Sequence, residues 1–164
     1  MMTYDLEERI WFMVDFDPST NFLVSANQKK RLTLLQRREN ENLFEEIYSL
    51  NLLSGIPTSV CWVTQELIMV GLALTKGKAK IQIISFKKTE IQEPVQLSKK
   101  SLDQHTANVE AIIAQRNKDR MYSQSFNEII IWRLESLILP IGVIKCPGNI
   151  KSIGLQRSGP KQEL

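Results

Sequence analysis

Residues 105–133, HTANVEAIIAQRNKDRMYSQSFNEIIIWR, decide the fold of this chain. The only histidine of the sequence opens the stretch and is followed by an apolar run at residues 109–113. The pair Ser123 and Ser125 comes next, and a second apolar run, rich in isoleucine, ends at Trp132. Isoleucine, valine and aromatic residues favour strands, and the polar residues between the runs favour turns. The stretch therefore predicts antiparallel strands joined by short connections.

Runs of the same character recur before this stretch and group into sets of four. The expected strands are residues 10–16, 22–26, 32–35 and 43–50 in the first set, 60–63, 67–74, 81–86 and 91–97 in the second, and 109–113, 121–123, 129–134 and 137–144 in the third. The sets recur with a period of about 42 to 50 residues, which is typical of the four-stranded blades of β-propellers. Leu34, Ile83 and Ile131 occupy equivalent places in the third strand of their sets. A partial run at residues 150–155 would open a fourth set.

The stretch from the histidine to the tryptophan resembles one degenerate repeat of the WD40 family. In that family a histidine, a hydroxyl residue, an acidic turn residue and a tryptophan form a buried hydrogen-bond chain. The resemblance implies that the members of such a chain here are His105, Ser123 or Ser125, Asn127 and Trp132. A buried indole N–H needs an acceptor, which a hydroxyl provides.

The stretch also departs from the family pattern at three places. Gln104 stands where a glycine usually precedes the histidine, and Trp132-Arg133 stands where Trp-Asp usually ends the repeat. Asn127 takes the place of the acidic turn residue and brings no charge.

The expected fold class is all-β: a partial or shortened WD40-like β-propeller of about three four-stranded blades plus a partial one. The blades are expected at about residues 8–52, 56–98, 105–145 and, in part, 149–156, followed by a flexible tail at 157–164. A propeller ring needs typically four to eight blades. The chain is therefore expected to be a fragment or short isoform, or to be closed by another copy or subunit.

An α+β domain is the alternative fold. Leu43, Ile47 and Leu50 could line one face of a helix, and residues 102–116 could form a second helix. Three or four strands with these two helices would also make a domain of ordinary size.

Composition places the chain among ordinary globular proteins. Apolar residues make up 43% and charged residues 24% of the sequence, and the formal net charge is +3. The N-terminus carries acidic residues where a signal peptide would be basic, and no apolar run is long enough to cross a bilayer. We therefore expect a cytoplasmic or nuclear protein without membrane contact. Cys61 and Cys146 are expected to be reduced, packed thiols, and no metal or cofactor is expected.

No arrangement of catalytic residues is evident in the sequence. His105 is the only candidate for a general base, Asp103 lies close to it, and no Gly-x-Ser-x-Gly nucleophile motif is present. We therefore expect no enzyme activity. The expected function is that of a protein-interaction scaffold, with other protein subunits as partners.

Clusters of lysine and arginine suggest RNA as the alternative partner, because such clusters can contact phosphates. The candidate contacts are Lys29, Lys30, Arg31, Lys76 and Lys78. The text FLVSANQKKRLTLLQR at 22–37, followed by TSVCWVTQELIMVG at 58–71, is similar to the non-catalytic WD40 subunit of the tRNA guanine-7 methyltransferase. This similarity implies an RNA-associated accessory subunit as an alternative function, beside an α+β adaptor domain.

Overall fold

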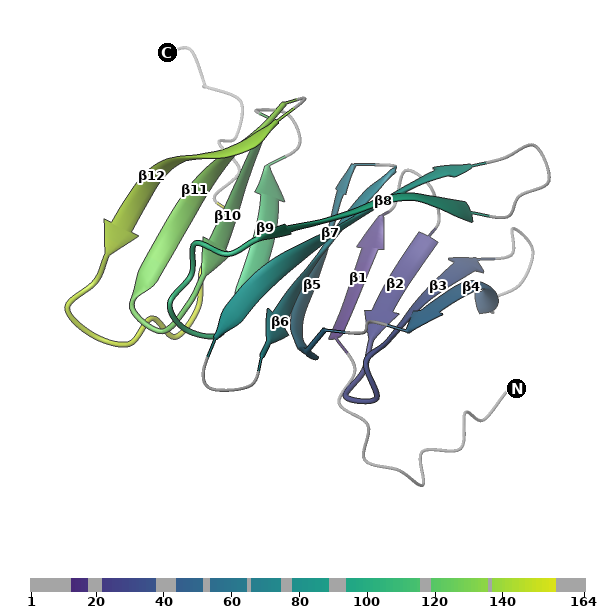
Figure 1. Ribbon diagram of the computed structural model, residues 1–164, viewed down its shortest axis with the longest axis horizontal. Helices are drawn as coiled ribbons and strands as arrows, with labels where there is room; N and C mark the ends of the chain where they lie inside the picture. The colour runs from purple at the N-terminus through teal and green to yellow at the C-terminus, as the bar shows by residue number, and fades with distance from the viewer. Residues whose placement is uncertain are drawn as a thin grey trace, which may run out of the picture.

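The computed structural model describes residues 13–17, 22–37, 44–51, 54–64, 66–74, 78–88, 94–115, 119–135 and 137–155. These residues form twelve strands in three antiparallel sheets of four strands each (Figure 1). The first sheet contains β1 (Met13–Asp17), β2 (Phe22–Ala26), β3 (Arg31–Arg37) and β4 (Phe44–Asn51). The second contains β5 (Ile56–Thr64), β6 (Leu67–Ala73), β7 (Ala79–Lys88) and β8 (Pro94–Leu102). The third contains β9 (Ala111–Gln115), β10 (Arg120–Gln124), β11 (Glu128–Leu134) and β12 (Ile138–Lys145).

In each sheet the strands are neighbours in chain order. Each strand turns back on the one before it, because short polar connections separate the apolar runs. In the β2–β3 turn the backbone N–H of Lys30 donates to the carbonyl of Asn27, and the Asn27 side chain accepts from the N–H of Arg31. The expected all-β class is therefore confirmed for the described residues.

The α+β alternative is wrong. Residues 44–51, within which one helix was expected, form strand β4 and pair with β3. Residues 102–115, within the second expected helix, contain the end of β8, an irregular connection and β9. No helix occurs in the part of the chain that the structure describes. Burial against neighbouring sheets has overridden the helical spacing of the apolar residues.

The three sheets stack face to face in chain order, and the second sheet is buried on both sides (Figure 1). Alternate residues of a strand point to opposite faces of its sheet. Trp62, Val70 and Ile84 accordingly pack against the first sheet, whereas Cys61, Met69 and Ile83 pack against the third. This explains why β6 is apolar on both faces without polar alternation.

The first strands of the sheets lie next to one another. β5 contacts both β1 and β9, whereas each sheet's fourth strand lies at the outer edge of its sheet. Between the first two sheets, the rings of Phe22 and Trp62 stack with their centroids 6.2 Å apart.

Most expected runs differ from the observed strands by a few residues at their ends, and two differ more. The run at 91–97 was expected to end the second set, but β8 extends to Leu102 and pairs along β7 from Ile81 to Lys88. Residues 150–155, expected to open a further set, contain no strand. Instead the backbone N–H of Ile150 donates to the carbonyl of Phe126, so this segment lies against the β10–β11 turn. The first residues of the run at 10–16 and the expected tail lie outside the described residues.

Candidate functional site

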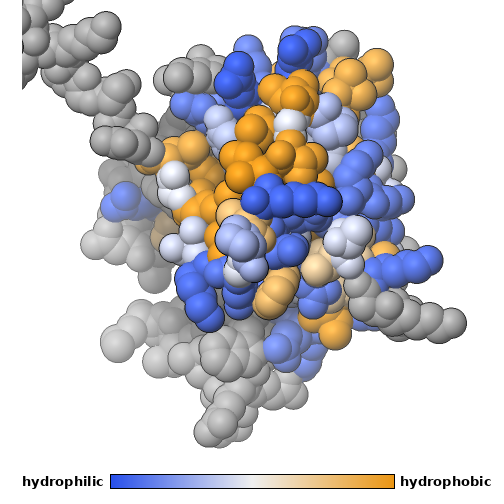
Figure 2. Space-filling view, turned by 90° about the vertical axis from the view of Figure 1, so that its left-hand side faces the viewer, coloured by the Kyte–Doolittle hydropathy of each residue, from blue (hydrophilic) through white to orange (hydrophobic). Residues whose placement is uncertain are grey.

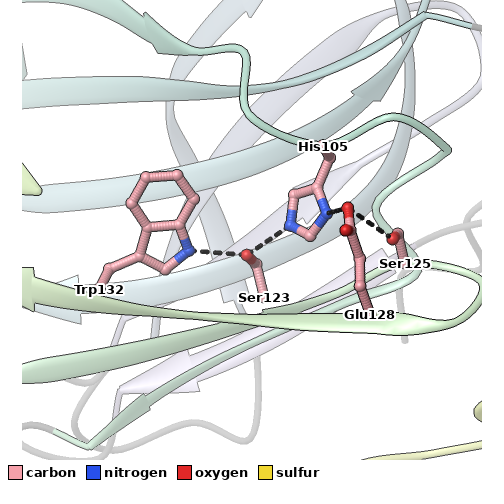
Figure 3. Close-up of polar contacts among 5 residues, drawn as sticks. All are labelled: His105, Ser123, Ser125, Glu128 and Trp132. Atoms are coloured by element: carbon pink, nitrogen blue, oxygen red, sulfur yellow. Dashed lines mark hydrogen bonds and ion pairs between the residues drawn. The ribbon is translucent and has the colours of Figure 1, made fainter. Parts of the chain in front are cut away.

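A chain of buried polar side chains lies between the second and third sheets (Figure 3). Its central residue is Ser123 on β10, whose side chain points away from water and whose residue is fully buried. The indole N–H of Trp132 on β11 donates to Ser123 Oγ at 2.7 Å. On its other side, Ser123 Oγ lies 2.6 Å from Nε2 of His105, in the connection between β8 and β9.

The chain continues from the histidine to a carboxylate. Nδ1 of His105 lies 3.1 Å from Oε1 of Glu128, the first residue of β11. Ser125 Oγ donates to the same Glu128 oxygen over 3.4 Å. The His105 and Glu128 side chains are only 1% and 11% exposed.

One arrangement of protons satisfies every member of this chain. Trp132 donates to Ser123, the Ser123 hydroxyl donates to Nε2 of His105, and Nδ1–H of His105 donates to Glu128. This arrangement requires a neutral imidazole. Burial lowers the pKa of His105 below its usual value of 6.5, although the hydrogen bond to Glu128 and its negative charge act in the opposite direction.

The backbone explains why these side chains meet. Ser123 pairs with Ile130 and Met121 pairs with Trp132 in the β10–β11 ladder, so Ser123 and Trp132 are diagonal neighbours on the same face. The β8–β9 connection then carries His105 over this face. The polar chain therefore ties a loop that leaves the second sheet to the hairpin of the third.

Four of the five residues that the family resemblance implies lie in the buried polar chain, and one does not. The structure brings His105, Ser123, Ser125 and Trp132 together. Asn127, however, does not take part: its side chain is exposed in the turn, and its backbone carbonyl accepts from the N–H of Cys146. Glu128, the next residue, supplies the carboxylate.

Glu128 was missed by the sequence analysis, although the sequence holds a signal for it. Residues 128, 130 and 132 alternate along one strand, so Glu128 must share the face of Trp132. Counting back from the tryptophan in steps of two would have found it. Asn127, the polar residue of the turn, was chosen instead, and it lies one residue before Glu128.

The connectivity Ser123–His105–Glu128 is also that of a serine hydrolase triad, but the surroundings differ. The Ser123 oxygen already accepts from the Trp132 indole and is covered by the second sheet. A nucleophile must be reached by its substrate. Asp103, the carboxylate considered from sequence, is exposed and takes no part in the chain. The described residues also contain no group of three His, Cys, Asp or Glu side chains that could hold a metal ion.

The described basic residues that were proposed as phosphate or partner contacts lie away from the buried polar chain, in or next to the connections between the second and third strands of the first two sheets. Lys29, Lys30 and Lys78 are exposed there, and Lys76 lies outside the described residues. Arg31 is engaged on its own sheet: its guanidinium donates to Glu46 at 2.7 Å and to Ser49 at 2.6 Å. Arg31 is thus paired with an acidic residue of its own sheet, and Lys78 belongs to a different sheet from Lys29 and Lys30.

Two further sequence expectations concern cysteines and membranes. Cys61 and Cys146 do not form a disulfide; Cys61 is buried and Cys146 is half-buried. Among the described residues, no helix has the length and apolar character needed to cross a membrane.

Comparison with known proteins adds no family. No protein-family model matches this chain, and a search of curated proteins also finds no match.

Proposed function

We propose that this chain is an array of WD40-like propeller blades and serves as a non-catalytic scaffold that holds partner proteins. The observation that carries the proposal is the buried chain Trp132–Ser123–His105–Glu128. It connects the loop before the first strand of a four-stranded sheet to the second and third strands of that sheet. The family resemblance implies a chain of this kind, although Glu128 stands in the place that was expected for Asn127.

The stacking of the sheets gives independent support. Each sheet is a four-stranded antiparallel meander, and the first strands β1, β5 and β9 lie side by side while the fourth strands lie outside. A propeller arranges its blades in this way around a central axis. The propeller reading thus accounts for both the polar chain and the strand order.

A scaffold presents variable turns on a rigid frame. The β2–β3 and β10–β11 turns lie at the same end of the stack (Figure 1). They expose Lys30 in the first sheet and Phe126, an aromatic residue 51% exposed, in the third. Exposed aromatic side chains are enriched where proteins bind one another. We assign partner binding to this rim.

Affinity purification with a matched pair of variants tests the assignment. Phe126 precedes β11, and Leu137, 64% exposed, follows it at the opposite end of the strand. The tagged chain should recover a reproducible set of proteins, Phe126→Ala should lose it, and Leu137→Ala should keep it. If both variants recover the same proteins as the unchanged chain, the rim does not bind them. If the chain recovers no protein above an empty-tag control, the scaffold proposal fails.

A further inference from the structure

The segment that follows β12 lies on the third sheet without forming a strand. We call residues 147–155 the strap; each of them is exposed or half-buried, and none belongs to a helix or strand. A Cβ on Gly148 or Gly154 would have no atom within 4 Å of it. The strap is therefore loosely packed on both sides of the residue that anchors it, Ile150.

The anchor is made by the backbone of one residue. The N–H of Ile150 donates to the carbonyl of Phe126 at 2.8 Å, and the carbonyl of Ile150 accepts from the side-chain amide of Gln124 at 2.8 Å. In an antiparallel ladder, the N–H and the C=O of one residue likewise both bond to the same neighbouring strand. Ile150 thus binds to the end of the third sheet as a residue of an added strand would.

The surface beside this anchor combines a hydrogen-bonding group with an apolar floor. Ser123 faces the second sheet, so the side chain of Gln124 points outward, where the strap lies over it and leaves only 1% of the residue exposed. Gln124 pairs with Ile129, and Ile129 pairs with Ile144, so the three form one row across the outward face. Ile144 is 49% exposed. Figure 2 looks onto this side of the molecule and shows hydrophobic side chains gathered there beside polar ones.

The strap does not satisfy this surface completely. Nε2 of Gln124 donates to the carbonyl of Ile150 and, at 3.3 Å, to the carboxylate of Glu110. Oε1 of the same side chain is buried and accepts no hydrogen bond from the described residues. A buried acceptor without a donor costs free energy. A peptide that supplies one further N–H to this oxygen would therefore bind better than the strap does.

We propose that the Phe126 carbonyl and the row Gln124–Ile129–Ile144 form a peptide-binding site that the strap occupies as a pseudo-ligand. The ligand is a short apolar segment of a partner protein, bound in an extended conformation, whose backbone replaces that of Ile150. In this mode of recognition, main-chain hydrogen bonds give affinity and the side-chain contacts give specificity. The inference deepens the proposed function and rests on it for the existence of a partner, because Phe126 belongs to the rim.

The strap must leave before a peptide can bind, so it acts as an autoinhibitory contact. A segment on a short covalent connection competes at an effective concentration in the millimolar range. Only peptides that bind more tightly than the strap, or chains whose strap is weakened, therefore fill the site. Weakening the strap should accordingly raise the affinity for every peptide that uses the same hydrogen bonds.

The experiment measures, by fluorescence anisotropy, how the full chain binds a labelled peptide with the sequence of residues 149–155, NIKSIGL. The unchanged chain should bind this peptide weakly. Ile150→Pro removes the N–H that donates to Phe126 and should lower the Kd of the peptide about tenfold, because one anchoring hydrogen bond of the strap is lost. Ile153→Pro is the matched control and should leave the Kd unchanged: Ile153 is also a half-buried isoleucine of the strap, but its N–H bonds to no described backbone group.

A double variant locates the bound peptide. Adding Gln124→Ala to Ile150→Pro removes the side-chain amide and should abolish binding, while circular dichroism checks that the strands are retained. The proposal is overturned if Ile150→Pro brings no gain, if Ile153→Pro brings an equal gain, or if binding survives Gln124→Ala. No partner protein enters this measurement. If the peptide binds as expected while the tagged chain recovers no protein, the scaffold proposal fails and the peptide site stands.

Discussion

At the scale of the residue, Ser123 holds the polar chain together. Its oxygen satisfies the Trp132 indole, and its hydroxyl hydrogen satisfies Nε2 of His105, so one small side chain serves two larger buried ones. A buried polar group left without a partner costs more than an average hydrogen bond contributes. The stability of the site therefore depends most on Ser123, although its side chain is small.

Ser123→Ala should lower the free energy of unfolding by roughly 2 to 3 kcal/mol, because it leaves both the indole N–H and the imidazole nitrogen without a partner. Ser125→Ala is the matched control, since Ser125 is equally buried but has a single long contact of 3.4 Å to Glu128. Ser125→Ala should lower the free energy of unfolding by less than about 1 kcal/mol. Urea denaturation of both variants measures the difference. Equal losses would show that Ser123 has no special place in the chain.

His105 should make the stability depend on pH. Burial lowers its pKa in the folded state below 6.5, so the unfolded chain binds more protons than the folded chain as the pH falls below that value. The stabilising contribution of the neutral imidazole is thus full above pH 6.5 and is lost as the pH falls toward the lowered pKa. The melting temperature should therefore decrease between neutral pH and about pH 5.5, above the range in which exposed carboxylates titrate.

A histidine contribution to this pH dependence can be assigned to His105, because the sequence contains one histidine. His105→Gln can still bond on both sides but does not titrate, so its melting temperature should be lower overall and nearly flat over this pH range. A slope that persists in His105→Gln would assign the pH dependence to other groups.

At the scale of the element, the junction between the second and third sheets depends on one glycine. A Cβ on Gly71 of β6 would lie 2.4 Å from Ser59 Oγ and 3.0 Å from the Val109 carbonyl oxygen. That carbonyl accepts hydrogen bonds from the hydroxyls of Thr58 and Ser59, at 2.6 Å and 3.1 Å. The glycine thus lets the connection before β9 lie directly against β6.

Gly71→Ala should destabilise the protein by about 1 to 3 kcal/mol, because the methyl group must displace Ser59 or the backbone at Val109. Gly142→Ala, also in a strand, is the control: its Cβ would meet Ile131 at an ordinary 3.5 Å. Thermal unfolding should show a clear decrease for the first variant and little change for the second. A neutral Gly71→Ala would mean that the two sheets are packed less closely than the structure shows.

Most strands could be predicted from the sequence because polar turns bound each apolar run, as for β2, β6 and β11. The last strand of the second sheet was placed too early, because the end of β8 is polar and its extent follows from pairing with β7. The hydrogen-bond partners of the site could be predicted from the resemblance except at the carboxylate. For the carboxylate, the turn residue Asn127 was chosen from the sequence, whereas the alternation of side chains along β11 indicates Glu128.

At the scale of the whole molecule, the described residues form a series of sheets whose main packing contacts join neighbouring sheets. One hydrophobic cluster joins the first sheet to the second, and another joins the second to the third. In such linear assemblies, stability is approximately a sum of sheet and interface contributions. The second sheet, shared by both clusters, should therefore be the most stable part of the molecule.

Hydrogen exchange can test this linear coupling with two cavity-forming variants. Leu34 lies in the cluster between the first and second sheets, and Ile130 lies in the cluster between the second and third. Leu34→Ala should speed amide exchange most in β2 and β3 and leave β10 and β11 nearly as slow as before, because the cavity weakens only one interface. Ile130→Ala should do the reverse. A uniform rise in exchange over all three sheets in either variant would show that the sheets unfold as one unit and that their arrangement in series has no energetic consequence.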